Sequence, residues 1–296
     1  MQDYFEWGSG LSLCGRIWAF KGIGGTKGET PSVPFMRQHV AGLCVAFRMC
    51  HVLRYHRHMP SWNIHIAHVE RLLGECSPDD LGIADANAFL FGNLVPDICV
   101  GFMVHDTAMR IDYRITHMTP GHTIPLPNAE RFWDAYLVRR RVTEGASISL
   151  LLGAWAHLVT DHVYNERFRD YCIERGIEIS DALRTRKQAD FDLFGRSLPI
   201  ESHVQITPEL LQAAHDFPPY RVLEEDVRRA VEVADAIVDS NTRPQGAENR
   251  YQELSEAWLQ DVFSACNDLL ATWLSAWRQL EEVGKSAGAA DIKETL

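Results

Sequence analysis

The sequence predicts an all-α protein. Apolar residues recur at helical spacing over several long segments, and the alternation of apolar and polar residues that marks β-strands is nearly absent. Hydrophobic residues make up 46% of the 296 positions, so the chain can bury a sizeable core as one large domain or two smaller ones. We therefore expect a multi-helix bundle with extra helices toward the C-terminus.

The first part of the chain differs from the rest. Its opening 34 residues are rich in Gly, Ser, Thr and Pro, which predicts a disordered or loosely held segment. Residues 1–58 carry a net charge of +4, which leaves −15 for residues 59–296. Because the helical pattern begins at Met59, a further hypothesis is that Met59 is the true initiator and that 1–58 is a mis-called extension.

From Met59 onward the helices can be placed in order. Ser61 is a candidate cap for the first of them and Gly74 its stop. The predicted helices span 59–74, 84–90, 128–142, 147–173, 180–194, 208–216, 221–239 and 248–283. Between them, FLFGNLVPDICVG predicts a turn in apolar sequence, and the prolines of 105–127 predict a loop. We expect a helical domain over 59–205, C-terminal helices packed on it over 206–283, and a tail over 284–296.

Composition excludes several classes of function. An acidic body argues against a broad nucleic-acid surface and against binding to anionic membranes. The sequence contains no run of 18 apolar residues, so we expect no membrane span, and we recognise no signal-peptide layout. The seven cysteines are scattered and form no CxxC, which favours free thiols in a reducing compartment. We expect a cytoplasmic protein.

His157 and Asp161 carry the strongest chemical signal. They lie four residues apart in the apolar stretch LLLGAWAHLVTDHVYN, so a helix would point both side chains at one spot. A carboxylate on such a helix is costly to bury alone. Two interpretations follow: a divalent metal such as zinc, which takes both ligand types, or a His–Asp ion pair.

Other ligand-type residues interrupt apolar sequence in the same half of the chain. His65 and His68 lie on the first predicted helix, Asp97 follows a proline in the apolar turn, and His117 lies in the loop. Each has a structural explanation when taken alone, as a core histidine bonded to a carbonyl or as a turn cap. Together they can converge, because metal sites in helix bundles are built from side chains on facing helices.

These segments resemble the zinc-dependent phospholipase C family. The motifs MPSWNIHIAH, FLFGNLVPDI, the dipeptide Thr116-His117 and LGAWAHLVTDHVYN occur in the order of that family's early His, Asp, His and HxxxD helix, over roughly 59–205. The resemblance implies an all-α bundle of phospholipase C type, shared with related single-strand nucleases. It implies a phosphodiesterase that uses a metal-activated water. The zinc ligands that it implies are His65, Asp97, His117, His157 and Asp161.

In this comparison Asp161 is able to bridge two ions, and Asn93, Tyr164 and Asn165 are candidates for orienting the ligands or the substrate. The secreted members carry a further HxxxE helix, which is missing here because Thr207 and Pro219 stand four residues after His203 and His215. Those members also bind zinc through an N-terminal Trp, whereas Trp62 is internal. We therefore expect one or two zinc ions. A lipid headgroup, a nucleotide and a small diester all remain possible substrates, and an oligomer is possible.

Two alternatives remain open. The order His68, His105-Asp106, Asp161 imitates that of the HD-type metal phosphohydrolases, which are also all-α. The other alternative is a non-catalytic helical protein with a vestigial or structural metal site, favoured by the missing HxxxE and the long Trp-bearing C-terminal helix.

Overall fold

The computed structural model describes residues 61–121, 123–138, 145–241 and 250–294, with side chains described up to residue 282. The chain divides into two units, Met1–Phe47 and Arg48–Leu296, and all described residues belong to the second. Within them every regular element is a helix, which confirms the all-α prediction. The predictions made for 1–58 lie outside the described residues.

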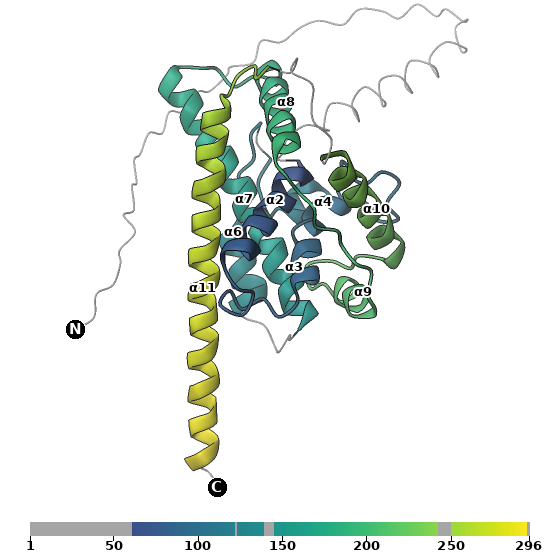
Figure 1. The fold of residues 1–296 in the computed structure, drawn as a ribbon, viewed down its shortest axis with the longest axis vertical. Helices are drawn as coiled ribbons and strands as arrows, with labels where there is room; N and C mark the ends of the chain where they lie inside the picture. The colour runs from purple at the N-terminus through teal and green to yellow at the C-terminus, as the bar shows by residue number, and fades with distance from the viewer. Residues whose placement is uncertain (1–60, 122, 139–144, 242–249, 295–296) are drawn as a thin grey trace, which may run out of the picture. The chain divides into compact units, whose positions relative to one another are not determined.

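The order of elements follows the predicted order closely (Figure 1). The helices are α2 (Trp62–Glu75), α3 (Ala86–Gly92), α4 (Val95–Ile98), α5 (Tyr113–Thr116), α6 (Ala129–Phe132), the π-helical η1 (Trp133–Val138), α7 (Ala146–Arg175), α8 (Asp181–Ser197), α9 (Pro208–His215), α10 (Glu224–Asn241) and α11 (Glu256–Glu294). The first predicted helix and the HxxxD helix are both present, as α2 and α7.

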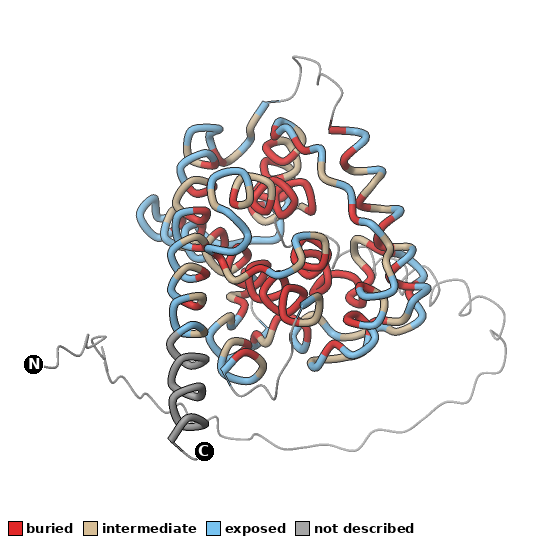
Figure 2. Tube along the Cα trace, turned by 60° about the horizontal axis from the view of Figure 1, so that its bottom comes forward, coloured by how far each residue is buried: buried red, intermediate tan, exposed pale blue. Residues whose placement is uncertain are grey.

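Two helices, α2 and α7, form the interior. Every residue of α2 from Trp62 to Val69 is buried, and so is every residue of α7 from Ile148 to Asp161. A helix buried on all sides is covered by other helices rather than by solvent. Helices α8, α10 and α11 pack on α2, while α3, α9 and α11 pack on α7. Figure 2 shows the buried positions gathered in the interior and the exposed ones on the outer faces of the helices. Polar residues on α2 and α7 are therefore held in the core.

Three predicted segments differ in detail from the structure. The turn predicted in FLFGNLVPDICVG contains a helical turn, α4, in which Pro96 lies within the first two positions and no intrahelical amide is lost. The helix predicted from 128 continues as η1 after Phe132. Helix α11 starts at Glu256 instead of 248 and runs to Glu294, through the predicted tail.

The late start of α11 has a local cause. The buried carboxylate of Asp190 accepts hydrogen bonds from the backbone amides of Gln252, Glu253 and Leu254 at 2.7, 2.7 and 2.8 Å. These bonds hold the chain in a bend just before the helix begins. Asp190 therefore anchors the C-terminal helix to α8.

Helices α3 and α7 cross with their backbones in contact. A Cβ atom added at Gly92 would lie 2.2 Å from the carbonyl oxygen of Leu150, and one added at Gly153 would lie 2.2 Å from that of Phe89. Because carbonyl oxygens of packed helices have little freedom to move, only glycine fits at these two positions. This crossing fixes α3 and the residue after it, Asn93, against the middle of α7.

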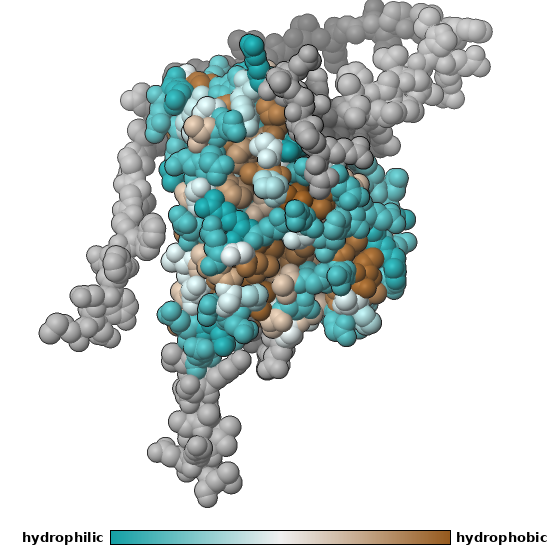
Figure 3. Space-filling view, viewed as in Figure 1, coloured by the Kyte–Doolittle hydropathy of each residue, from teal (hydrophilic) through white to brown (hydrophobic). Residues whose placement is uncertain are grey.

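The surface shows no membrane-spanning element among the described helices, because none combines the necessary length with sufficient hydropathy. The face drawn in Figure 3 is largely hydrophilic, with apolar residues gathered in patches between the polar ones. The exposed large apolar side chains include Trp273 and Leu280 on α11.

We predict that Gly92→Ala and Gly153→Ala each lower the free energy of unfolding by about 1–3 kcal/mol, because the added methyl group forces the two helices apart. Gly74→Ala is the matched control, since nothing lies within 4 Å of a Cβ at that helical position. Its expected effect is neutral or stabilising by up to ~1 kcal/mol. Urea denaturation of the three variants measures the difference. Equal stability of all three variants would show that the crossing is not tightly packed.

Candidate metal centre

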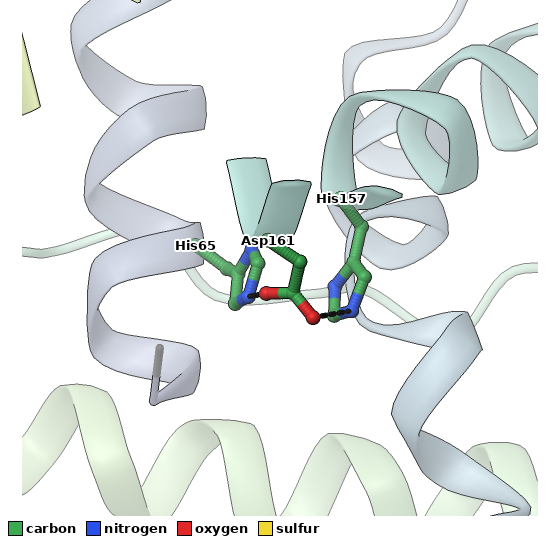
Figure 4. A group of neighbouring side chains, drawn as sticks. All are labelled: His65, His157 and Asp161. Carbon is green, nitrogen blue, oxygen red and sulfur yellow. Dashed lines mark ion pairs between the residues drawn. The ribbon is translucent and has the colours of Figure 1, made fainter. Parts of the chain in front are cut away.

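The five residues predicted as zinc ligands lie together in the core. They come from four different parts of the chain, and each is at most 2% exposed. The set consists of His65 on α2, Asp97 on α4, His117 directly after α5, and His157 and Asp161 on α7. Figure 4 shows the Asp161 carboxylate between the rings of His65 and His157, with one oxygen toward each. The helical spacing of His157 and Asp161 and the burial of α2 and α7 bring these groups to one point.

The separations between their polar atoms are short. Asp161 Oδ1 lies 3.3 Å from His65 Nε2, while Asp161 Oδ2 lies 3.5 Å from His117 Nε2 and 3.7 Å from His157 Nε2. Asp97 Oδ1 lies 3.6 Å from His117 Nε2, and Asp97 Oδ2 lies 3.9 Å from His157 Nε2. Atoms bound to one tetrahedral zinc at 2.0–2.2 Å stand about 3.3–3.6 Å from each other. The spacing therefore suits such an ion.

The partners of the three histidines determine which ring nitrogen faces the centre. His157 Nδ1 lies 2.7 Å from the backbone carbonyl of Asn93, and a carbonyl only accepts, so Nδ1 carries the hydrogen. The amide oxygen of Asn93 stands 3.1 Å from His65 Nδ1 and accepts there in the same way.

His117 has the same orientation for a related reason. Its Nδ1 lies 2.8 Å from the hydroxyl of Thr116, which donates its own hydrogen to the carbonyl of Tyr113. The hydroxyl oxygen therefore accepts from His117 Nδ1. All three histidines consequently direct the unprotonated Nε2 inward.

The centre is thus a convergence of acceptors, into which Trp62 Nε1 donates one hydrogen bond, to Asp97 Oδ2. The Nε2 atoms of His117 and His157 are only 3.1 Å apart. Asp97 Oδ1, both oxygens of Asp161 and His65 Nε2 are buried without a hydrogen-bond partner. Buried polar atoms left unpaired are costly, and a carboxylate is the costliest among them. One or two bound cations would satisfy these atoms, so the residues fit a metal site.

Electrostatics at the centre lead to the same conclusion. Burial lowers the pKa of His65 and His157 from 6.5 to about 3 and that of His117 well below its usual range, so the three rings are neutral at pH 7. Burial raises the pKa of Asp161 to about 6 and that of Asp97 well above 3.8. Too little positive charge lies near the two carboxylates to stabilise their ionised form fully. A divalent cation would supply that charge.

One lysine partly offsets this charge. Lys187 on α8 is buried, its ammonium donates to Asn165 Oδ1 at 2.8 Å, and it attracts the Asp161 carboxylate. Burial lowers the pKa of Lys187 to about 7, so its own charge is weakened at neutral pH. Asn165 accepts this hydrogen bond from Lys187 and donates another, through Nδ2, to the carbonyl of Pro125 at 2.9 Å.

The arrangement offers two overlapping positions for an ion, which share His157. Two metal-compatible groups exist among the described residues, His65–His157–Asp161 and Asp97–His117–His157. His157 has a single inward lone pair and can bind only one ion. A first ion would be held by Asp97, His117 and His157. A second would have His65 and Asp161 Oδ1, which leaves it short of protein ligands.

The remaining predicted residues have different positions. Asn93 contacts two of the five residues, as described above, whereas the Tyr164 hydroxyl lies 3.2 Å from His68 Nε2. His105 and Asp106 are exposed and belong to no metal-compatible group among the described residues. The structure therefore does not bring the HD-type set together. His68, the first residue of that set, stacks on Phe263 with ring centroids 4.2 Å apart.

The histidines of the missing HxxxE motif also lie apart from the centre. His203 and His215 are about half exposed and pair with Asp235 and Asp216 at 2.8 and 2.9 Å. Neither contributes to a buried cluster.

Several contributing residues were not predicted to take part in the centre. Trp62 Nε1 donates to Asp97 Oδ2 at 3.1 Å, and Thr116 and Lys187 act as described above. The ring of Tyr113 stacks on that of His117 with centroids 3.8 Å apart. The only hint was the position of Tyr113 one helical turn before a predicted ligand.

Comparison of the chain with known protein families, with curated proteins and with solved structures found no match. The function must therefore be argued from the residues of the centre.

We predict that zinc raises the melting temperature more at about pH 7.5 than at about pH 5.5. A carboxyl whose pKa is raised by burial contributes to the stability of the metal-free fold while it is protonated. For Asp161 this contribution is lost as the pH rises through about 6. Zinc requires the ionised group, so protons compete with it at the lower pH. The histidines compete little there, because the pKa of His65 and His157 is about 3.

Thermal melts with and without zinc at both pH values measure this shift. The Asp161→Asn variant, which cannot ionise at this position, is the control. An equal zinc shift at both pH values in the wild-type chain would contradict the assignment of the carboxylates as ligands.

Proposed function

We propose that this protein is a zinc-dependent hydrolase of phosphoester bonds, resembling the phospholipase C family in its centre. The observation that carries the proposal is the convergence of five buried His and Asp side chains whose inward-facing atoms are all acceptors. Three neutral imidazoles with two carboxylates form a mixed nitrogen and oxygen donor set. Zinc favours such sets, whereas magnesium and calcium favour oxygen alone.

When bound, zinc would polarise a phosphoryl oxygen and lower the pKa of a coordinated water toward neutrality. The protein's own residues would do the rest. Asn93 orients His65 and His157, Thr116 orients His117, and Trp62 holds one oxygen of Asp97. Because the centre lies among buried apolar side chains, charge there is weakly screened and acts strongly on a phosphate. Asp97 and Asp161 would be ligands and thus unavailable as a free base.

The order of the residues along the chain supports phosphoester chemistry over other hydrolyses. The early His, the Asp of FLFGNLVPDI, the Thr116-His117 dipeptide and the HxxxD helix resemble the phospholipase C family in sequence. The contacts among these residues agree with their roles in that resemblance, including a carboxylate, Asp161, with one oxygen toward each potential ion position. The lack of a further buried His/Glu pair on α9 or α10 supports one or two ions.

The second candidate function is a structural zinc site in a non-catalytic helical protein. The observation that favours it is the burial of the ligand set, because structural zinc sites are closed while catalytic ones keep an open position. The second ion position, with only His65 and Asp161 Oδ1 as protein ligands, favours the catalytic alternative, since open positions there are free for substrate. Activity and stability measurements separate the two.

We predict that the zinc-loaded protein hydrolyses a small chromogenic phosphodiester and that Asp161→Asn lowers kcat/KM by at least about a hundredfold, because metal assistance supplies several kcal/mol. Asp235→Asn is the matched control, since it alters an exposed carboxylate that also pairs with a histidine. Its kcat/KM should match the wild type.

Three other results would each exclude the proposal. Zinc-bound protein without activity, which unfolds when zinc is removed, would establish the structural site. Loss of activity in His105→Ala/Asp106→Ala, with Asp161→Asn active, would establish the HD-type alternative. A folded protein that binds no zinc would exclude both metal-dependent functions.

A further inference from the structure

Tyr113 is a sixth side chain at the centre. It lies on α5, one turn before His117, and the two rings stack with an interplanar angle of 23°. The stacking fixes the phenol ring beside a residue that contacts both carboxylates.

The Tyr113 hydroxyl is buried and has no hydrogen-bond partner among the described residues. Its ring stacks on His117, whose Nε2 lies 3.6 Å from Asp97 Oδ1 and 3.5 Å from Asp161 Oδ2. Burial raises the pKa of Tyr113 well above 10, so the group is a neutral O–H donor. This buried, unpaired hydroxyl therefore belongs to the ring that stacks on a candidate ligand, His117.

An unpaired buried hydroxyl costs about 1–3 kcal/mol, so its place at the centre requires a physical reason. No carboxylate oxygen of the centre accepts a hydrogen bond from this hydroxyl in the structure. An oxygen atom supplied from outside the protein would be a suitable acceptor. Phosphate offers several such oxygens, and it is the group that the proposed function would bring to the centre.

We propose that the Tyr113 hydroxyl donates a hydrogen bond to an oxygen of a phosphate group held at the centre, and so contributes to recognition of the substrate. This inference rests on the proposed function. It differs from a purely structural role, in which the ring stacks on His117 and the hydroxyl has no partner in any state.

Tyr113→Phe separates these roles, because phenylalanine keeps the stacked ring and removes only the hydroxyl. Zinc-loaded wild-type and variant proteins would be titrated calorimetrically with inorganic phosphate, after the zinc content of each has been measured. We expect equal zinc content and a phosphate Kd that is roughly tenfold weaker in the variant, the size expected for one hydrogen bond to a charged group.

Tyr171→Phe is the matched control. Its hydroxyl donates to the carbonyl of Glu253 at 2.9 Å, so the substitution also removes one hydroxyl that is part of the fold. Phosphate affinity should not change in this variant. If Tyr113→Phe does not fold, a phosphate-bound crystal structure of the wild type serves instead, with the phenol oxygen expected about 2.5–3.0 Å from a phosphate oxygen.

Each alternative outcome overturns the inference in a recognisable way. Equal phosphate affinity in the wild type and in Tyr113→Phe would mean that Tyr113 has only a structural role. Loss of zinc in Tyr113→Phe would make the phenol itself a ligand. Zinc binding without phosphate binding in the wild type would refute phosphate recognition while preserving the metal centre. Absence of zinc from the wild type would refute the proposed function itself.

Discussion

The close crossing of α3 and α7 is the constraint on which the rest of the centre depends. Gly92 and Gly153 let the two backbones touch, and the residues that follow them meet directly: the carbonyl of Asn93 lies 2.7 Å from Nδ1 of His157. Because the Asn93 side chain also contacts His65, one residue at the end of α3 orients ligands on both central helices. A bulkier residue at the crossing would change the stability of the fold and the geometry of the centre together.

This orientation has an energetic consequence. Partners outside the centre occupy the Nδ1 atoms of all three histidines, so their Nε2 lone pairs face two buried carboxylates. In the metal-free state, protons on the carboxyl groups offset part of the cost, which is why burial raises the pKa of Asp161 and Asp97. A divalent cation would replace those protons and relieve the remaining repulsion. Metal binding and stability are thereby linked through the same few atoms.

The sequence predicted the helices and the residues of the centre better than it predicted the groups around them. His157 and Asp161 could be paired because residues four apart share one helix face, and the ligand types in apolar segments marked His65 and Asp97. Asn93 was a candidate, but its contacts with two histidines depend on the helix crossing. The contributions of Trp62, Tyr113 and Lys187 depend on tertiary contacts between distant segments, which no local spacing encodes. The late start of α11 likewise depends on Asp190, about 60 residues earlier in the chain.

The central claim is that the five buried side chains hold zinc. Elemental analysis of the protein, purified without a polyhistidine tag, beside the His157→Ala/Asp161→Ala variant tests it most directly. The account predicts at least about one zinc per wild-type chain and almost none in the variant. A folded wild-type protein without metal would contradict the account, and the inward-facing histidines and carboxyl groups would then be polar core residues that share protons.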